Sequence, residues 1–184
     1  EGRVVGLYST RFTSAPKGWK ADVQLSYQGK KRRFSRQKYH YSAQERWQDG
    51  VLSRLDVNIR EGEKQRKFSL MREKTKLVDD RVWRESDFSI DLPIVTNHHF
   101  NPGIVQADRV LDTTTGTESP LYLSHLGETS VSVDGRSIPC DRYRYEGDPK
   151  GTEIWYAKAG QWIKLRYSDV TGTSVELRCV KCGI

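Results

Sequence analysis

Two alternating runs of apolar and polar residues, joined by Asp49-Gly50, form the clearest pattern in the chain. From Tyr39 to Trp47, and again from Val51 to Ile59, apolar side chains fall mainly at odd positions. A period of two places alternate side chains on opposite faces of a strand. Asp-Gly tolerates the positive φ angles of a tight turn. The pattern predicts a long antiparallel hairpin with one apolar and one polar face.

Similar patterns predict strands before and after this hairpin. Residues 19–27 alternate throughout, and an opening strand is expected over 4–12. Residues 68–83 predict two further strands that carry more charge than the others. Charge is typical of strands at the edge of a sheet, because it blocks pairing between sheets.

The last third of the chain, residues 130–179, predicts a meander of hairpins. Its first hairpin turns at Asp134-Gly135. The apolar positions then change from even (Ile138) to odd (Tyr143), which predicts a β-bulge at Pro139.

The alternation stops between residues 86 and 120. Asn101-Pro102 predicts the start of a short helix over about 101–110, because Asn caps helices and Pro suits their first turn. We expect residues 86–120 to form a loop-and-helix insertion, or lid, within a single domain over 1–184. The predicted fold is all-β: a curved antiparallel sheet, or an incomplete or closed barrel-like meander, carrying this insertion.

Composition adds an electrostatic preference. The net charge is +7 and the sequence pI is about 9.3. A basic protein favours anionic partners, among them an anionic membrane surface. Nucleic acid is disfavoured as a partner, because Trp19, Trp47 and Tyr41 are in phase with aliphatic residues and belong first to the apolar face. No cofactor is expected.

The first residues indicate that more chain once preceded them. Glu1 is not an initiator methionine, so we expect a processed mature form or a trimmed chain. The run Glu1–Leu7 is similar to the second half of the predicted hairpin at 159–165, which raises the question, left open by the sequence, of whether a strand preceded Glu1.

Cys179-Val-Lys-Cys182 is the candidate metal or redox motif. Two cysteines at this spacing ligate a metal when a turn brings both sulfurs together. Positions three apart in an extended strand face opposite ways, which favours a spectator pair or a disulfide. A metal role for Cys179 and Cys182 stays open as an alternative.

His98 and His99 are the candidate catalytic residues. They lie in the irregular segment, and loops held by a rigid sheet commonly carry function. One of them could act as a general base near neutral pH. The alternative is that both are ordinary packing residues.

Four short stretches resemble an uncharacterised family, mostly bacterial and often exported, known only as a domain of unknown function. They are Glu1–Gly6, Glu45–Gly50, Leu111–Gly116 and Glu153–Tyr167. The resemblance implies an all-β fold and secretion to a periplasm or cell envelope. It implies no activity and no catalytic residue.

The leading hypothesis is a non-catalytic, exported β-protein that binds a small hydrophobic or amphipathic ligand in a sheet-lined pocket. The residues expected to contact the ligand are Trp19, Tyr39, Tyr41, Trp47 and Phe100. One alternative is an enzyme acting on a small hydrophobic metabolite around His98 and His99. A second is a metal-binding envelope protein using Cys179 and Cys182.

Overall fold

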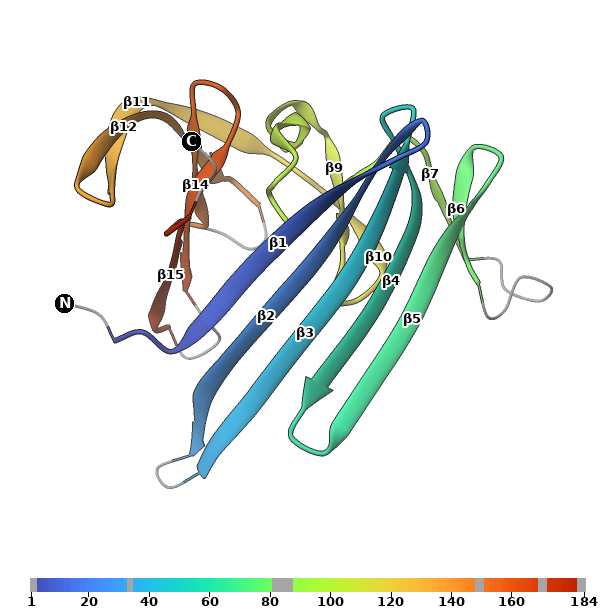
Figure 1. The fold of residues 1–184 in the computed structure, drawn as a ribbon, viewed down its shortest axis with the longest axis horizontal. Coiled ribbons are helices and arrows are strands. Elements are labelled where there is room, and N and C mark those ends of the chain that lie inside the picture. The colour runs from blue at the N-terminus through green and yellow to red at the C-terminus, as the bar shows by residue number, and fades with distance from the viewer. Residues whose placement is uncertain (1–2, 33–34, 81–87, 148–150, 169–171, 182–184) are drawn as a thin grey trace. The chain divides into compact units, whose positions relative to one another are not determined.

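The computed structural model describes residues 3–32, 35–80, 88–147, 151–168 and 172–181. The described chain is built from β-strands with one short helix, which confirms the predicted all-β class. It divides into two compact units (Figure 1). Unit 1 comprises Glu1–Ile94 with Asp112–Thr117, and unit 2 comprises Val95–Leu111 with Glu118–Ile184.

Unit 1 is one antiparallel sheet whose seven described strands follow each other in chain order. The strands are β1 (Gly6–Ala15), β2 (Gly18–Arg32), β3 (Ser35–Gln48), β4 (Val51–Glu61), β5 (Lys64–Glu73), β6 (Lys76–Asp79) and β7 (Ser89–Asp91). Figure 1 shows β1 to β5 as long ribbons lying side by side. Of the predicted arrangements, the structure has the open sheet, with β1 and β7 at its edges. Residues 81–83 of the predicted charged strands lie outside the described residues.

The predicted hairpin is β3 and β4. Asp49 and Gly50 have φ angles of 50° and 75°, as a tight turn of this kind requires. A register shift after Arg46 pairs Trp47 with Leu52. Leu52 is fully buried, whereas Val51 is only half-buried. The strict odd-position pattern is therefore wrong at the start of β4, because a bulge moves the apolar face by one residue.

The turn Asp112–Thr117 packs on the sheet of unit 1. The Asp112 carboxylate accepts hydrogen bonds from the backbone N–H and the hydroxyl of Thr114, both at 2.7 Å. The Arg66 guanidinium donates to the carbonyl of Thr114. Gly116 has a φ of 80° and lies so close to Phe68 that an added Cβ would stand 3.0 Å from that ring. A glycine is therefore required there both by the backbone and by the neighbouring ring.

Unit 2 contains a five-stranded antiparallel sheet and most of a smaller three-stranded sheet. The larger sheet consists of β11 (Leu123–Val133), β12 (Arg136–Tyr145), β13 (Glu153–Ala157), β14 (Trp162–Ser168) and β15 (Ser174–Arg178). The smaller sheet has the order β10 (Thr117–Pro120), β9 (Arg109–Asp112) and β8 (Val95–Thr96), with β8 and β9 parallel. The predicted insertion 86–120 thus contributes strands as well as loops.

The predicted helix starts where expected but is shorter. The Asn101 side chain accepts a hydrogen bond from the N–H of Gly103 at 2.9 Å, and Pro102 opens the helix. This helix, η1 (Pro102–Gln106), is a single 3₁₀ segment, and Val110 lies in β9 instead. No helix among the described residues is long and apolar enough to cross a membrane.

The five-stranded sheet carries apolar side chains on both faces. One cluster includes Tyr145, Ile154 and Leu165, packed with Ile104 of η1. The second cluster includes Cys140 and Trp155. The pairing of β11 with β12 runs without a shift from Gly127 to Val133, so the predicted bulge at Pro139 is wrong. The apolar positions change from even to odd numbers because Cys140 packs on one face of the sheet, whereas Tyr143 and Tyr145 pack on the other.

We expect Gly116→Ala to destabilise unit 1 more than Gly50→Ala does. Both substitutions place a side chain at positive φ, which costs about 1 to 2 kcal/mol. Only at position 116 must the Phe68 ring also move, since the space beside Gly50 is open. Overpacking adds about 1 to 3 kcal/mol. Urea unfolding would measure both variants, and equal losses in the free energy of unfolding would contradict the packing of the turn on Phe68.

Candidate functional site

Four of the predicted ligand contacts lie together on one face of unit 1. The register of β2 and β3 places Trp19 opposite Trp47 and Leu25 opposite Tyr41. Tyr39, two residues before Tyr41, projects from the same face. We call this side of β1 to β3 the aromatic face. The fifth predicted contact, Phe100, belongs to unit 2.

Aromatic rings form a stack at each end of the aromatic face. At one end the Trp19 and Trp47 rings stack with centroids 5.2 Å apart, and Phe12 packs edge-on to Trp19 at 5.8 Å. At the other end Tyr27 and Tyr39 stack with centroids 4.9 Å apart. Phe12 is 56% exposed and Tyr27 is 38% exposed. Both stacks therefore offer aromatic surface to solvent.

The centre of the aromatic face is buried and contains a carboxylate. Ala21, Val23 and Ala43 are small and almost fully buried there. Glu45 is also fully buried, and the indole N–H of Trp47 donates to its carboxylate at 2.6 Å. A buried charge needs such hydrogen-bonding partners to be tolerated. The face is thus apolar at its centre except for one fixed acidic group.

The tyrosines around Glu45 stay protonated at ordinary pH. Burial raises the pKa of Tyr8 and Tyr41 well above its usual value, and the negative charge of Glu45 raises it further. The Tyr41 hydroxyl lies 3.5 Å from the carbonyl of Thr113, a long contact for a hydrogen bond. Sequence reasoning did not select Tyr8 or Glu45. The one available signal was a carboxylate among the otherwise apolar odd positions of Tyr39–Trp47.

His98 and His99 are buried in unit 2 and contact different neighbours. The His98 ring stacks on Phe100 with centroids 5.8 Å apart, while the His99 ring meets Tyr145 edge-on at 6.2 Å. His99 has a φ of 65°, and its carbonyl accepts a hydrogen bond from the Tyr156 hydroxyl at 2.7 Å. The segment is held by packing and by this bond.

His99 is a weak base in the folded protein. Burial lowers its pKa from 6.5 to about 3, and the neighbouring His98 contributes to the shift. A general base works best when its pKa is near the working pH. His99 is neutral at pH 7 and has little tendency to accept a proton. Catalytic roles for His98 and His99, and ligand binding by Phe100, stay predictions.

Cys179 follows β15 and is disulfide-bonded, whereas Cys140 is a buried free thiol. Cys182 lies outside the described residues. A sulfur in a disulfide is not the thiolate that ligates a metal. The described residues contain no group of three His, Cys, Asp or Glu side chains placed to hold a metal ion. The metal site at Cys179 and Cys182 stays a prediction that applies to reduced protein.

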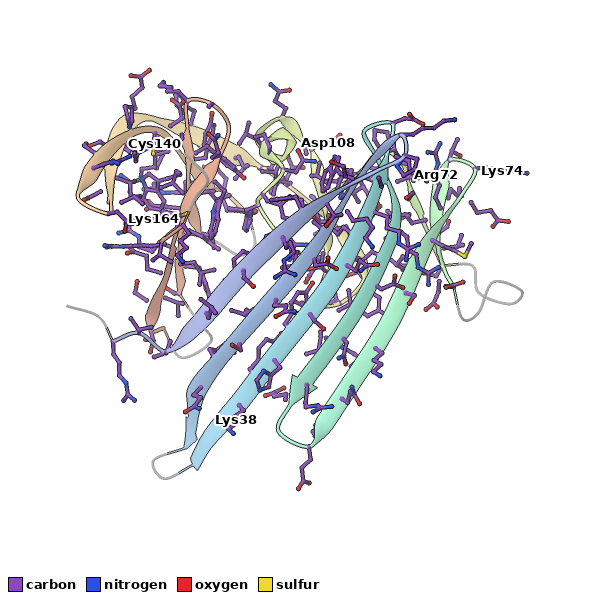
Figure 2. All side chains as sticks on the ribbon, viewed as in Figure 1. Lys38, Arg72, Lys74, Asp108, Cys140 and Lys164 are labelled. Atoms are coloured by element: carbon purple, nitrogen blue, oxygen red, sulfur yellow. The ribbon has the colours of Figure 1, made fainter. Side chains whose placement is uncertain are left out.

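A concentration of basic residues on the five-stranded sheet escaped sequence reasoning. Basic residues alternate with apolar ones in β12 and β14, and with Arg178 of β15 they share one side of the sheet. We call this side the basic face; Figure 2 labels one of its residues, Lys164 on β14. The available signal was the repeated pattern Arg142-Tyr-Arg144 and Lys164-Leu-Arg166. The two patterns come together only through the pairing of β12, β13 and β14.

Comparison with known proteins identifies the family. A family model described as domain of unknown function DUF6134 matches residues 1–180, and the chain belongs to this family. No curated protein matches the chain in sequence. A crystal structure of a DUF1089 family protein from Pseudomonas aeruginosa is similar at 13% identity and a TM-score of 0.40, over 98% of this chain and 93% of that one.

We expect His99 to make the protein less stable in mild acid. The unfolded residue takes up a proton near pH 6.5, whereas the folded residue stays neutral to about pH 3. The unfolded state binds more protons between these values, so stability falls as the pH falls through that window, by at most about 1.4 kcal/mol per pH unit.

The test compares wild type with His99→Asn, because Asn tolerates the positive φ at this position. Urea unfolding from about pH 7 to about pH 4 should give a shallower loss of stability for the variant, since the titration of acidic residues is common to both proteins. Parallel stability curves would show that His99 is not held neutral by the fold.

Proposed function

We propose that this protein is a non-catalytic binding protein that holds a small hydrophobic or amphipathic ligand against the aromatic face. The observation that carries the proposal is the pair of aromatic stacks at its two ends, each with a partly exposed ring, Phe12 or Tyr27. Aromatic side chains give a large apolar contact area in a fixed geometry. Stacked neighbours restrict these rings before a ligand arrives, which lowers the entropy cost of binding.

The tyrosine end favours an amphipathic ligand over a purely apolar one. Burial is the main cause that raises the pKa of Tyr39 to about 12, so its hydroxyl is a neutral hydrogen-bond donor. The charges of Arg66, Glu61 and Asp112 also act on this hydroxyl. A ligand could place its apolar part on the rings and its polar group beside these side chains.

The proposal of a non-catalytic role follows from how poorly the candidate groups are suited to proton transfer. The histidines considered for catalysis belong to unit 2, and burial makes His99 a poor proton acceptor. The aromatic face itself offers rings, methyl groups and a buried carboxylate that already accepts a hydrogen bond from Trp47. These groups suit contact with a ligand better than proton transfer.

We also propose that the protein is exported to an oxidising compartment such as the periplasm or cell envelope. The disulfide at Cys179 supports this location, because disulfides persist mainly in oxidising compartments. The positive net charge would favour an anionic membrane surface as a neighbour.

The ligand proposal predicts saturable binding of a medium-chain fatty acid that depends on Tyr27. Tyr27→Ser removes a partly exposed ring from the aromatic face, and loss of that contact should weaken binding on the order of tenfold. The matched control is Gln28→Ser, the next residue along β2, whose side chain is exposed and points to the opposite face. Tryptophan emission and calorimetric titration would measure the affinity.

Two results would contradict the proposal. One is that a broad set of fatty acids and amphipathic probes leaves the melting temperature of the protein unchanged, since a ligand that binds the folded state must raise it. The other is that Tyr27→Ser and Gln28→Ser bind the fatty acid equally well.

Export to an oxidising compartment predicts fewer reactive thiols than the three cysteines in the sequence. Protein isolated without reductant and then denatured should show the Cys140 thiol, and all three thiols only after reduction. Cys140→Ser should remove that first thiol. Three reactive thiols before reduction would contradict both the disulfide at Cys179 and the proposed location.

A further inference from the structure

Two rows of side chains cross the basic face, from β12 to β15. Strand register fixes both rows, because directly paired residues of neighbouring strands share a face. The first row is Arg142, Trp155, Lys164 and Arg178. The second row, two residues further along each strand, is Arg144, Glu153, Arg166 and Glu176. The basic face therefore gathers five cationic side chains around one indole and two carboxylates.

A cavity of about 380 Å³ lies on this face. Its cationic lining comes from Arg142, Lys164, Arg166 and Arg178, and Trp155 lies among them. Residues 129–132 of β11 form the remaining wall. The volume is near the lower end of the range for small-molecule sites. It suits a compact charged group.

The cations around the cavity are held in place before any ligand binds. Arg142 and Arg144 each donate to one carboxylate oxygen of Glu153, at 2.6 and 3.1 Å, and Arg166 donates to the other. Lys164 lies 2.7 Å from Glu176, which also pairs with Arg178. Lys164 and Arg142 further contact the Trp155 ring, at 4.6 and 5.4 Å from its centroid. Such contacts restrict long side chains and reduce the entropy cost of binding.

The charges do not cancel. Burial of Glu153 raises its pKa, but hydrogen bonds from the three arginines outweigh this and leave the pKa below its usual value. Glu176 is likewise held ionised by Lys164 and Arg178. Two negative charges therefore face five positive ones, and the cavity keeps a positive excess.

One donor of the cavity lining has no hydrogen-bond partner among the described residues. It is the Nε atom of Arg142, which is buried. A buried donor without a partner costs free energy, more so when its group is charged. An anion in the cavity could accept hydrogen bonds from the exposed parts of Arg166 and Arg178, whose side chains are 43% and 62% exposed. The Nε atom of Arg142 could join them after a shift of its side chain, because the atom is closed to solvent in this structure.

We propose that the cavity on the basic face is a binding site for a phosphate group carried by a small molecule or by a lipid. Phosphate offers several acceptor oxygens in a tetrahedral arrangement, and arginine guanidinium groups match such oxygens in pairs. A phosphate dianion also neutralises more of the excess positive charge than a single carboxylate does. The site is separate from the aromatic face, and the two proposals can fail independently.

The competing explanation is that the basic face is only a network of ion pairs that stabilises the sheet. Such a network needs no further anion, and partly exposed ion pairs contribute little. Phosphate would then act on the protein no differently from chloride at the same ionic strength. Anion specificity at constant ionic strength therefore separates the two explanations.

The experiment titrates full-length protein with inorganic phosphate and pyrophosphate at constant ionic strength, using calorimetry and the melting temperature. A second arm uses vesicles of phosphatidylcholine with and without phosphatidylglycerol. Arg178→Gln and Lys164→Gln each remove one cation of the cavity and should weaken binding about tenfold, typical of a hydrogen bond to a charged group. The exposed Arg136→Gln on β12 makes the same charge change outside the cavity lining and should bind normally.

Either source of phosphate supports the site if the cavity variants lose binding and Arg136→Gln does not. Binding of pyrophosphate indicates a soluble phosphorylated ligand, and binding only to vesicles with phosphatidylglycerol indicates a lipid headgroup. The proposal is overturned if neither binds, if chloride reproduces the effect, or if all three variants behave alike. Arg178 is mostly exposed, so its substitution should leave the fold intact. The Tyr27→Ser variant should bind phosphate as wild type does.

Discussion

Strand register is the constraint on which both proposed sites depend. Backbone N–H and C=O groups in a sheet must pair with a neighbouring strand, and the pairing chosen decides which side chains share a face. In unit 1 this places Trp19 beside Trp47 and Tyr27 beside Tyr39. In unit 2 it aligns Arg142, Trp155, Lys164 and Arg178 from four strands. The chemistry of each surface follows from hydrogen bonds in which those side chains take no part.

The two buried carboxylates play different parts in their sheets. Glu45 lies in an apolar region of the aromatic face and accepts a hydrogen bond from the Trp47 indole. Glu153 has a nearly buried side chain that accepts from three arginines, and it organises a whole group of cations. Removing Glu153 would leave those arginines repelling one another. Glu153 therefore fixes where the three guanidinium groups lie, while ion pairs with such partly exposed arginines contribute little to stability.

Local pattern was enough to predict the strands but not the assembly of the surfaces. The β3–β4 hairpin was predictable because alternation and the Asp49-Gly50 turn agree. Leu52 was misplaced because a bulge after Arg46 has no signature in the sequence. The bulge expected at Pro139 came from assuming one apolar face, whereas Cys140 and Tyr145 pack on opposite faces. The basic face was missed because its members belong to separate hairpins. The weak basicity of His99 results from tertiary burial, which spacing does not reveal.

The register shift between Trp155 and Tyr156, where β13 meets β14, has a consequence for how the family can diverge. Trp155 pairs with Lys164, whereas the next residue, Tyr156, pairs with Trp162. Ile163 is therefore an extra residue of β14 that has no partner on β13. This bulge lets the sheet keep Trp155 and Lys164 in one row. A deletion or insertion nearby would turn the cations inward and the core residues outward. Length changes during evolution should therefore collect in the turns, such as the one at Lys158–Gly160, while these two strands diverge by substitution alone.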